Sequence, residues 1–329
     1  MKEKVTIITG SSGEIGQNLI AHYSKIKNKK IIAIDLEKFD GHNKIFHFIK
    51  GSILDENILN SLSNKYIIDE IYHLAAILST KAEKNPELAQ EVNIKGTMNI
   101  FNIALNQNLK NKIITKVFFP SSIAVYKINS KVETYNDLIN EDSYCNPKTK
   151  YGQHKLFCEN IGTALDKYGN ELNLKIDFRC IRFPGIISAN TLPTGGTSDY
   201  APEMIHHAFQ KKMYTSFANQ ESCLPFIVMP DAINSILSIM NCKKNKLNKN
   251  VYNITSFSPT VMDLYKILKN QFPEFLLEYK IDKNRQNIIN GWPNFIDDSQ
   301  AKKDWGWEPV FNLKTAFTNY IYPQLKNNK

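Results

Sequence analysis

Short apolar runs alternate with longer amphipathic stretches along the first half of the chain. The apolar runs predict buried strands at residues 5–8, 31–34, 45–48, 71–74, 117–119 and 178–182. Segments of helical periodicity lie between them and predict helices over residues 15–26, 86–105 and 149–168, the last ended by Gly169. Strands that alternate with helices through short connections are typical of a parallel sheet covered on both faces. We therefore predict an α/β fold with a doubly wound parallel sheet.

The pattern changes after Pro184-Gly185. Residues 191–200 are rich in Pro, Gly, Ser and Thr, which predicts a loop, and a loop of this length between regular elements is more often functional than idle. The remaining residues mix short helical and strand patterns. We predict a first domain over residues 1–183 and a smaller mixed α/β lobe over residues 184–329, with the option that the lobe returns strands to the first sheet.

Composition narrows the class of protein. The 329 residues are 42% hydrophobic and 22% charged, as expected of a globular protein. No stretch approaches the roughly 18 apolar residues of a membrane span, and a strand from residue 4 leaves no room for a targeting peptide. The five cysteines lack metal-ligand spacing, which favours reduced thiols. We expect a cytoplasmic protein without a membrane or metal partner.

The net charge of +9 raises the question of nucleic-acid binding. The lysines, however, lie in asparagine-rich runs such as residues 25–30 and 243–246, without interleaved aromatic side chains. These runs are typical of solvated loops, so we expect no nucleic-acid partner.

A glycine-rich segment separates the first predicted strand from the first helix. Gly10 permits a tight turn, Gly13 lets the backbone approach a phosphate, and Gly16 lets the helix pack closely. The helix N-terminus that follows supplies backbone N–H groups for a pyrophosphate. The segment therefore predicts a Rossmann-type dinucleotide site in residues 1–183, to which Ser12, Glu14 and Ile15 also belong. A glycine-rich turn without a ligand is the alternative, and the flanking strand and helix argue against it.

Asp35 ends the second predicted strand, where a carboxylate can accept hydrogen bonds from the adenine-ribose hydroxyls. Its charge would repel a 2′-phosphate, and the following Leu36-Glu37 offers no arginine to compensate. The sequence thus favours NAD over NADP. The alternative is a strand-end carboxylate that faces water.

Further candidates for the cofactor site are Ser52, Ile53, His73, Leu74, Ala75 and Asn93. Ser52 fits either an adenine contact or a loop turn. The small residues after His73 suit close approach of a flat cofactor, whereas His73 itself fits a hydrogen-bonded core histidine better than a catalyst. Asn93 is suited to bonding backbone or to a water relay toward Lys155, and we favour the structural role.

Tyr151 and Lys155 carry the candidate chemistry. Four residues apart on a helix, they share a face. An ammonium beside a phenol favours the phenolate and is expected to lower the tyrosine pKa below its usual value of about 10. The hydroxyl of Ser122 can then hold a substrate alcohol while the phenolate takes its proton. Together with a dinucleotide site, this set indicates hydride transfer at a carbinol or carbonyl carbon.

In combination, the glycine loop, Asp35, residues 73–76, Asn93, Ser122 and the Tyr151/Lys155 pair resemble the extended short-chain dehydrogenase/reductase family. Residues 304–309 are similar to that family's C-terminal signature, so the resemblance covers nearly the whole chain. Within the family, the segments that resemble its group of short-chain-type L-threonine 3-dehydrogenases are residues 74–79, 120–126, 182–188, 195–201 and 292–301. The last three segments are the specific ones.

The resemblance implies oxidation of the C3 hydroxyl of L-threonine with NAD, giving 2-amino-3-oxobutyrate. It implies Tyr151 as the base, Lys155 as its activator and nicotinamide-ribose anchor, and Ser122 as the hydroxyl partner. By the same resemblance Pro184 and Ile186 would frame the nicotinamide, Ser79, Thr197, Ser198 and Asp199 would hold the amino acid's charged groups, and Trp292 would cover the pocket unless it is simply a packed tryptophan.

Two other functions remain open at this point. A nucleotide-sugar epimerase or dehydratase of the same fold would need a larger C-terminal lobe with basic residues, which residues 191–201 lack. A non-catalytic dinucleotide sensor would be expected to have lost Tyr151 or Lys155. The resemblance further implies a homodimer, or a dimer of dimers, through the helices at residues 86–105 and 149–168. The apolar positions expected at that interface are Ile94, Met98, Ile100, Leu156, Ile161 and Leu165.

Overall fold

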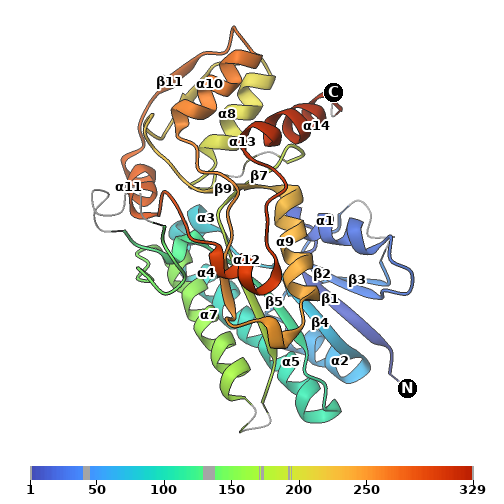
Figure 1. Cartoon of the computed structure of the whole chain (residues 1–329). Coiled ribbons are helices and arrows are strands. Elements are labelled where there is room, and N and C mark those ends of the chain that lie inside the picture. Colours follow the sequence, from blue (N-terminus) through green and yellow to red (C-terminus); the bar gives the residue numbers. More distant parts are fainter. Residues whose placement is uncertain are drawn as a thin grey trace. The chain divides into compact units, whose positions relative to one another are not determined.

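A seven-stranded sheet has the strand order β10-β6-β5-β4-β1-β2-β3. Its strands β1 to β5 are labelled in Figure 1. The computed structural model describes residues 2–39, 45–128, 138–169, 171, 174–191, 193 and 195–327. The strands are β1 Lys4–Thr9, β2 Ile31–Asp35, β3 His47–Lys50, β4 Ile67–His73, β5 Lys116–Ser122, β6 Asp177–Phe183 and β10 Val251–Asn253. Strand β1 pairs in parallel with both β2 and β4, and the parallel pairing continues to β3 and β5. The predicted α/β fold with a parallel sheet is confirmed.

All six predicted strands are present, and the largest shifts in their ends are in β3, β4 and β5, the last of which ends at Ser122 and not at residue 119. Strand β4 starts at Ile67, four residues before the predicted run, because the polar pair Asp69-Glu70 interrupts its apolar pattern. Strand β3 begins two residues later than predicted and is an edge strand of the sheet, where one-sided burial weakens the apolar signal. The seventh strand, β10, comes from beyond residue 184 and lies next to β6.

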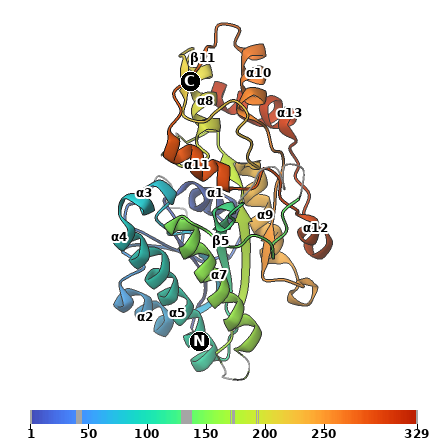
Figure 2. The same cartoon turned by 90° about the vertical axis from the view of Figure 1, so that its left-hand side faces the viewer.

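Helices cover both faces of this sheet. On one face lie α2 (Glu56–Lys65), α5 (Gly96–Asn111) and α7 (Lys150–Tyr168) (Figure 2). They pack through a cluster that includes Leu59, Phe101 and Cys158. On the other face, Tyr23 of α1 (Glu14–Tyr23) stacks beside Tyr72 of β4, with ring centroids 5.6 Å apart. The sheet is therefore doubly wound, because its strands bury side chains alternately toward the two helical layers.

The helix predicted over residues 86–105 is not a single α-helix. It consists of α4 (Pro86–Gln90), a π-helical turn at Glu91–Lys95, and α5. Helix α2 was not predicted, although Asp55 caps it by accepting from the backbone N–H groups of Asn57 and Ile58. By contrast α7 begins at residue 150 and ends before Gly169, as predicted.

The chain divides into two compact units, each built from separated segments. The first comprises Met1–Ser121, Gln153–Ile181 and Ile236–Val251, and the second comprises Ser122–Gly152, Arg182–Ser235 and Tyr252–Lys329. The division expected from the sequence, into an NAD-binding domain over residues 1–183 and a substrate-binding lobe over residues 184–329, stays a prediction. The remaining elements are α3 Ser79–Lys84, β7 Gly185–Ile187, α8 Tyr200–Phe209, β8 Tyr214–Ser216, β9 Phe226–Val228, α9 Met229–Asn241, α10 Val261–Gln271, β11 Leu277–Tyr279, α11 Lys283–Gly291, α12 Ser299–Trp305, α13 Leu313–Thr315 and α14 Tyr322–Asn327.

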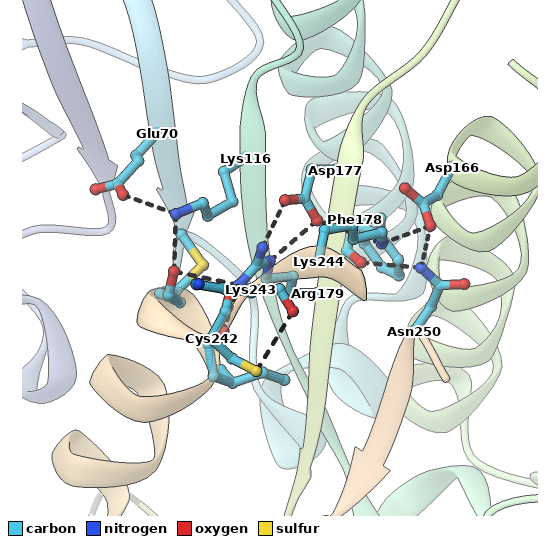
Figure 3. A network of polar contacts seen from close by, with 12 residues as sticks. Glu70, Lys116, Asp166, Asp177, Phe178, Arg179, Cys242, Lys243, Lys244 and Asn250 are labelled. Atoms are coloured by element: carbon cyan, nitrogen blue, oxygen red, sulfur yellow. Dashed lines mark hydrogen bonds and ion pairs between the residues drawn. The ribbon is translucent and has the colours of Figure 1, made fainter. Parts of the chain in front are cut away.

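Two cationic side chains from neighbouring strands donate hydrogen bonds to the C-terminal end of α9 (Figure 3). The guanidinium of Arg179 donates to three carbonyl oxygens at and just after this end, and Lys116 Nζ donates to one of them over 2.8 Å. Asp177 pairs with Arg179 over 2.7 Å. The last carbonyls of a helix lack partners within the helix and carry partial negative charge. The two cations therefore anchor the end of α9 on the sheet.

The apolar positions expected at a dimer interface differ in exposure. Ile100 is fully buried in the core of the first unit, so its assignment to an interface is wrong. Met98 and Ile161 also pack partly against that core. The apolar side chains that these helices do expose include Leu88 of α4 and Phe157 of α7, each 44% exposed.

Candidate active site

The glycine loop has the backbone geometry that its spacing requires. Gly10 has a φ of +67°, and a β-carbon there would come within 2.5 Å of the backbone nitrogen of Ala75. A β-carbon at Gly16 would meet the carbonyl oxygen of Gly10 at 2.6 Å. Only glycine fits both positions, because the loop, the start of α1 and the end of β4 approach one another closely. Glu14 and Ile15 form the first turn of α1.

The start of α1 has the properties of an anion site. Gly13 is the capping residue and has no side chain to bond the first N–H groups of this ten-residue helix. Ser11 is fully buried, and its Oγ has no hydrogen-bond partner among the residues that the structure describes. A pyrophosphate can accept from such groups at the positive end of a helix. The residues present therefore fit a dinucleotide.

Asp35 ties the glycine loop to the end of β2. Its Oδ2 accepts from the backbone N–H of Ser12 over 2.8 Å, and its Oδ1 accepts from that of Leu36 over 2.7 Å. The Ser12 hydroxyl in turn donates to the carbonyl oxygen of Glu37. A carboxylate has about four acceptor sites, so Asp35 keeps capacity for ribose hydroxyls.

His73 is a core histidine. Its two ring nitrogens lie 2.8 Å and 3.0 Å from the hydroxyl oxygens of Thr9 and Thr97. Burial, with a smaller contribution from the charge of Lys155, lowers its pKa to about 3. The ring is therefore neutral and hydrogen-bonded on both sides, as the structural alternative requires. Beside it, the backbone N–H of Leu74 donates to the carbonyl oxygen of Thr9 over 3.1 Å.

Asn93, Ser52 and Ile53 have local structural partners. The Asn93 amide bonds both the N–H and the carbonyl of Ile77, over 2.7 Å and 2.9 Å, and so fixes the segment after β4. Ser52 Oγ accepts from the backbone N–H of Leu54 over 3.1 Å, which is a loop turn. Ile53 packs against Gly96, where a β-carbon would come within 2.4 Å of its side chain. Their contacts with a cofactor stay predictions.

The first turn of α7 is locked onto the segment that follows β5. Thr149 Oγ1 accepts from the N–H of Gly152 over 3.1 Å. A β-carbon at Gly152 would lie 2.1 Å from the carbonyl oxygen of Ala124, so only glycine permits this approach. Ser122 ends β5, and its Oγ accepts from the N–H of Ala124 over 3.2 Å. Tyr151, which precedes Gly152, is thereby fixed relative to the Ser122 segment.

Lys155 follows Tyr151 by one helical turn and is buried. Its Nζ donates to the carbonyl oxygen of Pro120 over 2.6 Å and lies 4.5 Å from the centre of the Phe119 ring. Burial lowers its pKa to about 8, because desolvation disfavours the ammonium. A lysine whose pKa is lowered this far toward neutral pH is typical of functional sites.

The expectation of a lowered pKa at Tyr151 is wrong for this structure. Burial raises the pKa of Tyr151 above its ordinary value, because a buried phenolate loses its hydration. The ammonium of Lys155 is itself destabilised by burial and bonds the Pro120 carbonyl, so the desolvation of the phenol dominates.

In the second unit, two predicted segments converge. A β-carbon at Gly185, between Pro184 and Ile186, would lie 3.2 Å from Ser198 Cβ. Ile186 pairs with Ile227 in the small sheet of β7 and β9. Asp199 Oδ2 accepts from the N–H groups of Gly195 and Gly196 over 2.9 Å and 2.6 Å, which closes the loop in front of α8. Thr197 is buried within it.

Two further predicted residues have clear places. Trp292 is buried and follows the last residue of α11, which supports the packed-tryptophan alternative. Ser79 is the first residue of α3 in the first unit.

Arg285 was not predicted from the sequence. It donates from Nη2 to the carbonyl oxygen of Gly196 over 2.5 Å. The sequence feature that could have identified Arg285 is its residue type, because arginine is rare in this lysine-rich chain.

A cavity of about 460 Å³ lies at the amino ends of the strands in the first unit. It is lined by Lys4, Asp69, Glu70, Ile114, Lys116, Asp166, Lys175, Asp177 and Lys244. Ligands of open α/β sheets bind at the opposite, carboxyl ends of the strands. Its lysines and acids form ion pairs such as Lys116–Glu70 and Lys244–Asp166, so we do not place the active site there (Figure 3).

Within the described ranges, no group of His, Cys, Asp and Glu side chains is arranged to hold a metal ion. None of the helices in the same part of the chain combines the length and the apolar character needed to cross a membrane.

Comparison with known proteins identifies relatives over the whole length. The pattern of the NAD dependent epimerase/dehydratase family matches residues 6–255. A Bos taurus protein named L-threonine 3-dehydrogenase, mitochondrial, is 32% identical over 318 residues, which cover 96% of this chain and 81% of that protein. A solved monomeric L-threonine 3-dehydrogenase from a metagenome database, in its apo form, is 36% identical with a TM-score of 0.85, covering 99% of this chain and 100% of that one. L-threonine dehydrogenase from Clostridium difficile is 30% identical with a TM-score of 0.87, covering 100% and 99%.

Proposed function

The chain belongs to the NAD dependent epimerase/dehydratase family, and we propose that it is an NAD-dependent dehydrogenase that oxidises the C3 hydroxyl of L-threonine to 2-amino-3-oxobutyrate. The observation that carries this proposal is the first turn of α7. There Tyr151 precedes Lys155 by one turn, and Gly152 allows this turn to pack closely against the segment after Ser122. Relatives named L-threonine dehydrogenase, similar over nearly the whole chain, support the choice of substrate.

The first unit would hold the cofactor. The N–H groups at the start of α1 and the buried Ser11 hydroxyl would bind the pyrophosphate, and Asp35 would accept from the adenine-ribose hydroxyls. The carboxylate of Asp35 favours NAD, because it would repel the 2′-phosphate of NADP. When bound, the nicotinamide supplies the hydride acceptor.

The protein's own side chains would remove the proton of the substrate hydroxyl. Ser122 would hold the substrate hydroxyl while Tyr151 takes its proton as general base. At neutral pH the phenol of Tyr151 is protonated, since burial raises its pKa. The positive charge of Lys155, which is present below its own pKa of about 8, would offset part of that burial effect and favour the phenolate near neutral pH. The hydroxyls of Thr197 and Ser198 suit a small zwitterion.

The other site residues expected from the sequence belong to this proposal as well. Pro184 and Ile186 would flank the nicotinamide, and Ser79 would contact the substrate. We also propose a homodimer, or a dimer of dimers, through α4, α5 and α7, whose exposed Leu88 and Phe157 would be covered. The metagenomic relative is described as monomeric, so light scattering at micromolar concentration decides this point for the chain.

A nucleotide-sugar epimerase of the same family is the second candidate. One observation favours it: Arg285 brings a basic side chain to Gly196, beside the loop that sequence reasoning found free of such residues. The test measures NADH absorbance after L-threonine and NAD are added to the purified protein. A parallel sample measures the conversion of UDP-galactose to its epimer. Formation of NADH from L-threonine supports the dehydrogenase. Conversion of the nucleotide sugar without NADH from L-threonine would replace it by the epimerase.

A further inference from the structure

Arginine is scarce in this chain. Of 41 basic lysine and arginine residues, the arginines are Arg179, Arg182 and Arg285. Arginine differs from lysine in its planar fork of donors, which can bind a carboxylate through two parallel hydrogen bonds. Because lysine fills nearly all the other basic positions of this chain, the contacts made by each arginine fork are informative.

Two of the three arginines serve the interior of the protein. Arg179, only 2% exposed, donates to the carbonyls at the end of α9 and pairs with Asp177 (Figure 3). Arg182, 4% exposed, donates to the hydroxyl of Tyr126 over 2.9 Å and to the carbonyl oxygen of Glu141 over 2.6 Å. Both forks are directed at groups of the protein itself.

Arg285 differs from them. Its Nη2 donates to the carbonyl oxygen of Gly196, and its guanidinium carbon lies 3.1 Å from the centre of the Phe217 ring. These contacts hold the group in place from two sides. Its Nε is buried without a hydrogen-bond partner in the part of the chain that the structure describes. A buried donor of a charged group without a partner is unfavourable, and a bound anion would satisfy it.

The acidic side chains near Arg285 make their hydrogen bonds elsewhere. Asp199 Oδ2 accepts from Gly195 and Gly196, and Glu203 Oε2 accepts from the Tyr214 hydroxyl over 2.7 Å. Burial raises the pKa of Glu203, while the charge of Arg285 acts in the opposite direction. Neither acid forms an ion pair with Arg285 within the described ranges, so the guanidinium keeps donors for another partner.

We propose that Arg285 binds the carboxylate of the amino-acid substrate, an inference that rests on the proposed dehydrogenase function. The arginine contacts Gly196, and Thr197 and Ser198 follow directly in the loop proposed to hold the substrate. Its fork matches a carboxylate in shape and charge. Arg285 thus selects substrates that carry an anionic group, and its contact with Gly196 places the guanidinium beside the substrate loop.

The test compares two substrates that are oxidised at an equivalent carbon. L-Threonine carries the carboxylate, and 1-amino-2-propanol is the same molecule without it. In Arg285→Gln we expect kcat/KM for L-threonine to fall by about 10- to 100-fold, mainly through KM, as for the loss of a charged hydrogen bond. For 1-amino-2-propanol we expect a change below about threefold, because this substrate has no carboxylate for the guanidinium to bind. Arg285→Lys should recover part of the loss.

The matched control is Lys283→Gln, which removes an exposed positive charge from the same helix, α11. It should leave both substrates unchanged, since a solvent-exposed charge is screened. A second measurement uses the non-reacting L-2-aminobutyrate, whose binding to the NADH complex of the wild type should be weakened in Arg285→Gln while NADH affinity stays the same. This measurement decides the question even if 1-amino-2-propanol turns over too slowly to quantify.

The outcomes separate this inference from the function on which it rests. A wild-type protein that leaves L-threonine unoxidised contradicts the proposed function. A working dehydrogenase whose Arg285→Gln variant keeps full kcat/KM and full L-2-aminobutyrate affinity contradicts the assignment of Arg285. Equal losses for both substrates, with unchanged L-2-aminobutyrate affinity, would reduce Arg285 to a loop-positioning residue and overturn the proposal.

Discussion

Gly152 lies so close to Ala124 that a β-carbon at position 152 would come within 2.1 Å of the Ala124 carbonyl oxygen. The residue before this glycine is the proposed base, and the residue two positions before Ala124 is Ser122. The close approach thus fixes the separation of the two groups proposed to handle the substrate hydroxyl, and it explains why a glycine follows the tyrosine.

Gly152→Ala should therefore impair catalysis more than cofactor binding. The added methyl group has to displace backbone, an overpacking that costs roughly 1–3 kcal/mol. A displacement of the base by about 1 Å can lower the rate by up to about 100-fold. We expect kcat for L-threonine to fall by about 10- to 100-fold, while NAD affinity by titration stays near that of the wild type. Gln153→Ala, at the exposed next position of the helix, is the control and should retain its rate.

Asp35→Asn should narrow the preference for NAD over NADP. The amide keeps an acceptor for the Ser12 N–H, so the glycine loop should stay in place, but the charge that repels a 2′-phosphate is lost. The ratio of kcat/KM for the two cofactors is the measurement. An intact protein that uses NAD and NADP equally well would remove the basis for choosing NAD.

The pH profile should reflect the raised pKa of Tyr151. Because burial keeps the phenol protonated at neutral pH, kcat/KM for oxidation should rise with pH up to about 8, above which Lys155 loses the charge that favours the phenolate. Lys155→Met removes the charge that favours the phenolate, so the rising limb should move to higher pH and the rate should fall. Lys167→Met, an exposed lysine later in the same helix, should keep the wild-type profile. A profile unchanged in Lys155→Met would show that Lys155 does not act on the base.

His73 should make the fold sensitive to acid. Its pKa is lowered to about 3 in the folded protein from an ordinary value of 6.5, so between these values the unfolded chain binds more protons. Stability should therefore rise with pH across this window and be lost as the pH falls from 6.5 toward 3, with a slope of up to about 1.4 kcal/mol per pH unit. Urea unfolding at several pH values measures the slope. His73→Gln should reduce it, whereas His22→Gln, at an exposed position, should not.

Much of the fold follows from local patterns. The apolar runs of β1 and β2, the spacing of Gly10, Gly13 and Gly16, and the four-residue step from Tyr151 to Lys155 are all readable within short windows of sequence. Each depends on the local periodicity of strands and helices or on the turn that glycine permits.

What could not be predicted depends on contacts between distant parts of the chain. No local pattern states that Val251–Asn253 pairs beside β6, or that Arg285 reaches Gly196 across 89 residues. The direction of the Tyr151 pKa depends on how deeply the folded protein buries the phenol, and sequence spacing reveals only the neighbouring lysine. Ile100 illustrates the same limit, because one apolar helix position looks alike in a core and in an interface.

The central claim is that Tyr151 is the base for oxidation of L-threonine, and the most direct test is the rate of NADH formation by the wild type and by Tyr151→Phe. The phenylalanine keeps the ring and removes the hydroxyl, so NAD binding should survive while kcat falls by about 10²- to 10⁴-fold. The wild type should use L-threonine, use L-serine poorly for want of the methyl contact, and hardly use D-threonine. Near-full activity in Tyr151→Phe, or no NADH from L-threonine with the wild type, would contradict the account.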